Sequence, residues 1–262
     1  MLRANMKQFI ANFFLHKKPL MMPHFKSPAL LDLQKPKRVL VFAPHPDDDI
    51  LGCGGTLYLL SKTASVCVVL VTDGSGAGEL PSGTDQVRQM EFKTALNFLG
   101  IGQLTYLNQP DGSFEPNQSM RKSLIQILQS FDPDWVFLPA RFDYHRDHIL
   151  ISQFVSETVV AISEKATLIE YETSAPLQAT HLVDITDAFD LKVAALNKHE
   201  TALRYGDYLR AITGLNSYRG LYLGFNKFAE AFKVNPKSSP SILLRLKTVY
   251  WRWRYGTQTT RR

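Results

Sequence analysis

The residue types best suited to chemistry lie in two short clusters, each directly after an apolar stretch of strand length. The first cluster joins one imidazole to three consecutive carboxylates: His45, Asp47, Asp48 and Asp49. The second, at residues 143–148, holds two aspartates and two histidines. Imidazole nitrogen and carboxylate oxygen are ordinary zinc ligands, and adjacent carboxylates raise one another's pKa unless a cation neutralises them. An acidic helix start would explain one aspartate but not the whole first cluster, so we predict a metal site.

The elements that must position these clusters alternate between strand and helix. Residues 38–43 and 135–139 are continuous apolar runs, typical of strands buried on both faces. Further strands are expected at 66–71, 104–107, 166–171 and 180–183, and helices at 53–62, 86–99, 118–130, 148–163 and 187–205. This alternation favours an α/β fold with a doubly wound, mainly parallel sheet and helices on both faces.

Both clusters should lie at one edge of this sheet. Ligands of open α/β sheets bind at the carboxyl ends of the strands. If strands 38–43 and 135–139 are neighbours, the side chains that follow them converge. His145 and His148 are three residues apart, which in a first helical turn directs both side chains toward the same side.

Length and composition indicate the domain organisation and the cellular compartment of the protein that carries this site. The chain has 262 residues with 45% hydrophobic content, enough for one large domain with appendages. We expect a basic amphipathic segment with a proline-containing linker over 1–37, a central domain over 38–235 and a basic aromatic tail over 236–262. Two cysteines, Cys53 and Cys67, exclude a disulfide framework and favour a reducing compartment. No apolar run reaches about 18 residues and no convincing signal peptide is present, so a cytoplasmic location is expected.

The charge is divided between an acidic body and basic ends. Residues 1–40 carry a net +7, residues 241–262 carry +6, and the region between them carries −7. An acidic body argues against nucleic-acid binding. The tail interleaves arginines with aromatic and aliphatic residues, among them Trp251 and Trp253. We predict that both termini contact an anionic membrane surface, at its inner face. The alternative is that they pack on the body or on a partner subunit; the sequence makes no prediction about the oligomer.

The two clusters resemble the motifs of the PIG-L/LmbE-like family of zinc-dependent N-deacetylases. Residues 44–49 are similar to the family's Ala/Pro-His-Pro-Asp-Asp-Glu motif, and residues 145–148 to its His-x-Asp-His motif. The resemblance covers about residues 38–232 and implies a Rossmann-like fold. Weaker matches are the loop after Thr72, the combination of Arg88 with Glu91, the turn at 110–112 and the stretch 229–232, to which we assign no role. Asp49 departs from the pattern, because the family usually has glutamate there.

The resemblance also implies roles for individual residues. By position, His45, Asp48 and His148 are expected to bind one Zn²⁺ per chain, which leaves a coordination position open for water. Asp47 is expected to be the general base. His145 is expected to stabilise the oxyanion or protonate the leaving amine, a step that Asp47 could also perform. Asp147 would orient His145 and favour its charged form.

The remaining implications concern substrate and activity. Arg88 and Asp111 are candidates for binding sugar hydroxyls or a phosphate, against a solvated helix face for Arg88 and a turn residue for Asp111. The expected function is removal of the acetyl group from an N-acetylated amino sugar such as N-acetylglucosamine, in a glycoconjugate or lipid-linked sugar. One alternative is a zinc amidase acting on another N-acyl small molecule. Another is a membrane-associated protein that binds zinc without catalysis, which would not need Asp47, His145 and Asp147.

Overall fold

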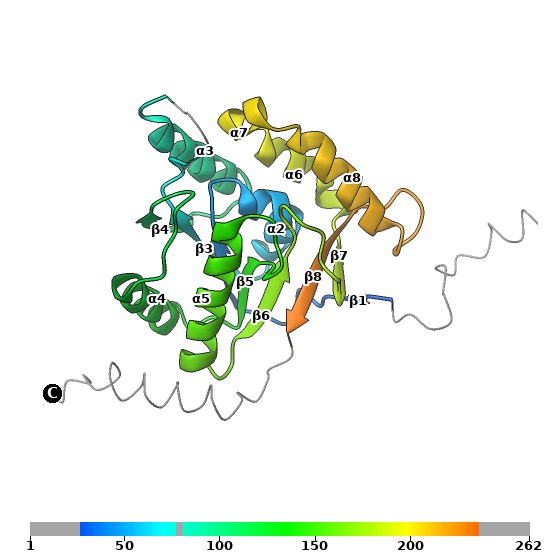
Figure 1. The fold of residues 1–262 in the computed structure, drawn as a ribbon. Coiled ribbons are helices and arrows are strands. Elements are labelled where there is room, and N and C mark those ends of the chain that lie inside the picture. Colours follow the sequence, from blue (N-terminus) through cyan, green and yellow to red (C-terminus); the bar gives the residue numbers. More distant parts are fainter. Residues whose placement is uncertain (1–26, 77–80, 236–262) are drawn as a thin grey trace, which may run out of the picture.

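One mixed sheet organises the chain (Figure 1). The computed structural model describes residues 27–76 and 81–235, and these form an eight-stranded sheet with the order β1-β7-β8-β6-β5-β2-β3-β4. The strands are β1 (Ala29–Leu30), β2 (Arg38–Ala43), β3 (Ser65–Thr72), β4 (Gln103–Gln109), β5 (Trp135–Pro139), β6 (Thr167–Tyr171), β7 (His181–Asp184) and β8 (Ala229–Asn235). Neighbouring strands are parallel except for β8, which runs antiparallel to both β6 and β7.

Successive residues of the central strands face two separate cores. In β2, Val39 and Val41 pack in one apolar cluster, whereas Leu40 and Phe42 pack in the other. The first cluster is covered by α2 (Asp48–Leu60), α3 (Thr84–Phe98), α6 (Phe189–Leu196) and α8 (Tyr208–Gly220), and the second by α4 (Gln118–Phe131) and α5 (Arg146–Ile162). The α/β fold with a mainly parallel sheet and helices on both faces is therefore confirmed. A strand that faces two cores needs apolar residues at every position, which explains its unbroken apolar run.

Some elements differ from the sequence-based expectation. The helix expected over 187–205 is interrupted, and the structure has the short 3-10 helix η1 (Thr186–Ala188), α6 and α7 (Glu200–Tyr205) instead. Helix α2 begins at Asp48, five residues before the expected start, and is broken at Cys53. Helix α8 and strand β8 were not predicted. Strand β1 lies in the stretch assigned to the linker and pairs with β7.

The predictions about the two termini fall mainly outside the described residues. Residues 1–26 and 236–262 include the amphipathic N-terminal stretch and the aromatic tail. Within 27–76 and 81–235, no helix combines the length and apolar character that crossing a bilayer requires.

Candidate metal centre and catalytic cleft

The two polar clusters meet because their strands are neighbours. Strand β2 pairs in parallel with β5, in a register that places Val39 opposite Trp135. Both strands therefore end at the same edge of the sheet, as the convergence of the clusters requires. The loop after β2 is fixed by Thr72, whose amide and hydroxyl donate to the carbonyl of Pro44 at 3.0 and 2.8 Å. After β5, His145 caps the N-terminus of α5.

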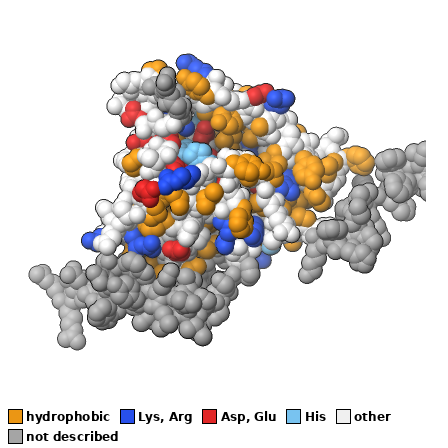
Figure 2. Space-filling view, viewed as in Figure 1, with side chains coloured by type: hydrophobic (Ala, Val, Ile, Leu, Met, Phe, Trp, Pro, Cys, Tyr) orange, Lys and Arg blue, Asp and Glu red, His pale blue; other side chains and the backbone are white. Residues whose placement is uncertain are grey.

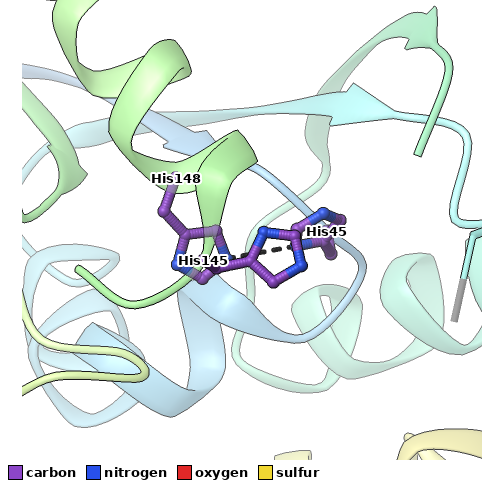
Figure 3. A group of neighbouring side chains, drawn as sticks. All are labelled: His45, His145 and His148. Carbon is purple, nitrogen blue, oxygen red and sulfur yellow. Dashed lines mark hydrogen bonds between the residues drawn. The ribbon is translucent and has the colours of Figure 1, made fainter. Parts of the chain in front are cut away.

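Three donor atoms form a nearly equilateral triangle at this edge. His45 Nδ1, Asp48 Oδ2 and His148 Nε2 are each 3.1 Å from the other two. Figure 3 shows the three imidazoles gathered here, with a dashed line between His45 and His148. Tetrahedral zinc with bonds of about 2.0 Å would separate its ligands by about 3.3 Å. The spacing of the triangle therefore fits a small divalent cation.

The outer nitrogens of the two imidazoles show why a cation fits. His45 Nε2 lies 3.1 Å from Asp111 Oδ1 and 3.5 Å from Asp147 Oδ2. His148 Nδ1 lies 3.3 Å from Asp143 Oδ1 and 3.0 Å from the hydroxyl of Thr173. Carboxylates accept protons, so in each neutral ring they favour the tautomer protonated on the outer nitrogen. The two inner nitrogens and the Asp48 oxygen then converge as three lone pairs, the arrangement that a metal ligand set requires.

The electrostatics of the triangle also favour positive charge. Burial lowers the pKa of His148, but the charge of Asp48 and the hydrogen bond to Asp143 outweigh it and raise that pKa to about 9. Burial raises the pKa of Asp48, yet the two histidines hold it well below its usual range. The carboxylates thus create a potential in which either protons or a cation are stabilised.

Asp47 faces the same cleft but stands outside the triangle. Its Oδ2 lies 4.0 Å from Arg88 Nη2. Burial, followed by the negative charge of Asp48, raises the pKa of Asp47 to about 7, against the lowering effect of Arg88 and the histidines. A carboxylate whose pKa lies near neutrality is suited to accept and return a proton.

The structure places Arg88 and Asp111 together in the cleft. Arg88 is buried rather than on a solvated face, and its Nη1 donates to the carbonyl of Gly74 at 2.7 Å and to Asp111 Oδ2 at 3.3 Å. Since the other oxygen of Asp111 faces His45, this carboxylate connects Arg88 to the metal-type donors. Asp111 is thus not only a turn residue, which was the alternative left open by the sequence. Its contact with His45 was not predicted.

The carboxylate of Asp147 has partners other than the predicted one. Its Oδ2 accepts the amide of Gly112 at 2.8 Å and lies near His45, while the amide of Asp147 donates to His145 Nδ1 at 3.2 Å. His145 therefore accepts at Nδ1, and its proton belongs on Nε2. Burial and the charges of His45 and His148 lower the pKa of His145, outweighing Asp147. Asp147 thus favours the charged form of His145, as expected, but it contacts His145 through its backbone amide rather than its carboxylate, and the net shift of the pKa of His145 is downward.

Several residues that line the cleft or hold His148 were not predicted from the sequence. The cleft has a volume of about 230 Å³ and is partly open to solvent, and α8 forms one wall with Tyr208, Ala211, Ile212 and Leu215. Asp143 and Thr173 hold His148. Asp143 belongs to the second polar cluster and could have been assigned from its position two residues before His145. The wall of α8 and the contact from Thr173 carry no comparable signal.

These features define a class of protein: a Rossmann-like α/β fold with two histidines and one carboxylate that could hold a metal ion, and a separate carboxylate in the same cleft. A family model described as PIG-L, GlcNAc-PI de-N-acetylase, matches residues 40–159. The chain is 30% identical over 192 residues to the uncharacterized deacetylase YaiS of Escherichia coli K12, covering 67% of this chain and 97% of that protein. The chain belongs to the PIG-L family and is an N-deacetylase of that family.

One further relative is similar in sequence, and one solved structure shares the fold. The diacetylchitobiose deacetylase of Thermococcus kodakarensis is 28% identical over 227 residues, covering 76% of this chain and 84% of that protein. The solved structure of N,N'-diacetylchitobiose deacetylase from Pyrococcus horikoshii has the same fold, with a TM-score of 0.70 at 23% identity, over 92% of this chain and 96% of that one. Deacetylases of the family are metal-dependent, and the triangle described above could hold the ion.

Proposed function

We propose that this chain is a zinc-dependent hydrolase that removes the acetyl group from an N-acetylated amino sugar within a glycoconjugate or lipid-linked sugar. The observation that carries the proposal is the separation of roles in one cleft. Three potential ligand atoms lie 3.1 Å from one another, and Asp47 and His145 line the same space without belonging to that triangle. Relatives named as sugar deacetylases support the substrate class.

The site residues can perform amide hydrolysis in a simple order. Zinc bound by His45, Asp48 and His148 would polarise the amide carbonyl and lower the pKa of water to about 7. Asp47 accepts the proton of the attacking water. The Nε2–H of His145, directed by the acceptor role of its Nδ1, donates to the oxygen that becomes negative. The amine nitrogen then receives a proton from Asp47 or His145 as the C–N bond breaks.

The α8 wall of the cleft supports a substrate with an apolar portion. Tyr208, Ala211 and Leu215 lie three to four residues apart on α8, so they share one face of the helix. Tyr218 follows at the same spacing on α8 and is 54% exposed, and its ring centroid lies 6.3 Å from that of Tyr222, which comes after the helix and is 42% exposed. Figure 2 shows orange side chains over α8, beside the pale-blue histidine atoms. A sugar ring held at the donors could therefore extend an attached apolar group along α8.

A substrate comparison tests this function. Purified zinc-loaded protein should release primary amine from N-acetylglucosamine and from its octyl glycoside. Because the alkyl chain contacts α8, the KM for the glycoside should be roughly tenfold lower. Leu215→Ser should reduce that preference and leave the free sugar unaffected, which makes the free sugar the matched control. Cleavage of other N-acyl compounds, with none of any N-acetyl sugar, would contradict the substrate class.

Peripheral membrane attachment through the termini is a separate part of the proposal. It rests on the charge and the aromatic content of residues 1–26 and 236–262. We expect the full chain to sediment with anionic vesicles at low salt and not with neutral ones, because each basic residue contributes about 1 kcal/mol at an anionic surface. A chain of residues 27–235 is the control. The attachment is wrong if the full chain stays in solution or if the shortened chain binds equally well.

A further inference from the structure

Helix α2, which begins with Asp48, is broken near its middle. Cys53 has the non-helical angles φ −146° and ψ 19°, and it separates a short first segment from the second. In a regular α-helix the amide of Gly55 would donate to the carbonyl of Leu51. Breaking a buried helix leaves backbone donors and acceptors that need other partners, because unpaired buried groups cost free energy.

A buried ion pair supplies partners on both sides of the break. Lys192 Nζ, from α6, donates to the carbonyl of Leu51 at 2.8 Å and to Glu230 Oε1 at 2.7 Å. Glu230, from β8, accepts the amide of Gly55 at 2.9 Å and the amide of Thr56 at 2.7 Å. Both side chains are fully buried. Lys192 and Glu230 therefore bridge Leu51 to Gly55, in place of one helical hydrogen bond.

The first segment of α2 is also pressed against the sheet. A Cβ added to Gly52 would lie 2.2 Å from a ring carbon of Tyr171, in β6. The Tyr171 hydroxyl in turn donates to the carbonyl of Phe42 at 2.7 Å, at the end of β2. The short segment that carries Asp48 is thus held by Tyr171 on one side and by Lys192 at its last carbonyl.

We propose that Lys192 and Glu230 are positioning residues for Asp47 and Asp48, because they maintain the break that sets the direction of the first segment of α2. Without the pair, the segment could continue as a regular helix, and Asp48 Oδ2 would leave the triangle. This inference rests on the proposed function, in which Asp48 binds the metal. Buried ion pairs are weak evidence for stability and are better supported as determinants of one particular arrangement.

Metal affinity separates a positioning role from a merely structural one. Zn²⁺ binding to the full-length variants Glu230→Gln, Lys192→Met and the double variant would be measured against a chelating dye, with circular dichroism to confirm folding. We expect the affinity to fall roughly 10- to 100-fold, as for other residues that orient ligands. Leu124→Ala, on α4 across the sheet, is the matched destabilising control and should keep its affinity within about twofold. A folded pair variant with the parent's affinity would overturn the inference.

A second measurement needs no substitution. Coupling between the pair and the metal is reciprocal, so Zn²⁺ binding should slow hydrogen exchange of the Gly55 and Thr56 amides more than that of amides in α4. Equal effects in α2 and α4 would contradict the inference. Neither experiment uses a substrate, so both results can be interpreted even if the proposed reaction is wrong. Zinc binding by a variant that lacks the Asp48 carboxylate would instead refute the assignment of Asp48 as a ligand.

Discussion

Replacing Asp47 by asparagine is expected to remove most of the hydrolytic activity while the protein keeps its metal and its fold. Asp47 faces the cleft beside Arg88, and the three converging donor atoms belong to other residues. Asparagine cannot accept the proton of the attacking water. Loss of a positioned general base typically costs about 100-fold or more, so kcat should fall by at least that factor.

The matched control for this change is Asp49→Asn. Asp49 is adjacent in sequence and fully buried, but it does not line the cleft. Burial, followed by the charges of Asp47 and Asp48, raises its pKa well above the usual range, which favours the protonated form that the neutral amide resembles. The two variants would be compared by amine release and zinc content. Activity of Asp47→Asn within a few-fold of the parent would exclude Asp47 as the base.

Removal of either histidine of the triangle is expected to abolish stoichiometric zinc binding. His45→Ala and His148→Ala each delete one of three donor atoms; the first also leaves Asp111 and Asp147 without their nitrogen partner, and the second leaves Asp143 without its partner. Elemental analysis of the purified variants should show strong loss of zinc, with a parallel loss of activity. His181→Ala, in β7, removes a histidine remote from the cleft and should retain the metal. Near-stoichiometric zinc in both ligand variants would reject the assignment.

The sequence predicted best the strands in which every residue is buried and therefore apolar. Strands β2 and β5 face two cores, so every position is apolar and their ends are marked by the change to polar residues. The convergence of His45, Asp48 and His148 then needed only that β2 and β5 be neighbours. The meeting of the two clusters therefore followed from strand order and a local pattern, whereas the choice of these three residues as ligands rests on the resemblance to the PIG-L family.

What could not be predicted depends on contacts between distant segments. The carboxylates of Asp111 and Asp147 both face His45, which requires three loops to approach one another. Local sequence slightly favours a turn over a binding site for Asp111. The division of residues 187–205 into separate helices likewise depends on tertiary packing, which overrides helix propensity. The role of Glu230 could not be inferred, because its partners lie 174 and 175 residues away in the chain.

The late position of β8 in the chain has a consequence for biosynthesis. This strand enters the sheet between β6 and β7, after every other described element has been translated. Domains generally begin to fold while the ribosome is still extending the chain. Until residue 230 leaves the exit tunnel, however, the amides of Gly55 and Thr56 lack their carboxylate partner. Under the proposed role of Lys192 and Glu230, the donor atoms near the start of the domain would therefore reach their final geometry only after β8, the last strand among the described residues, has inserted.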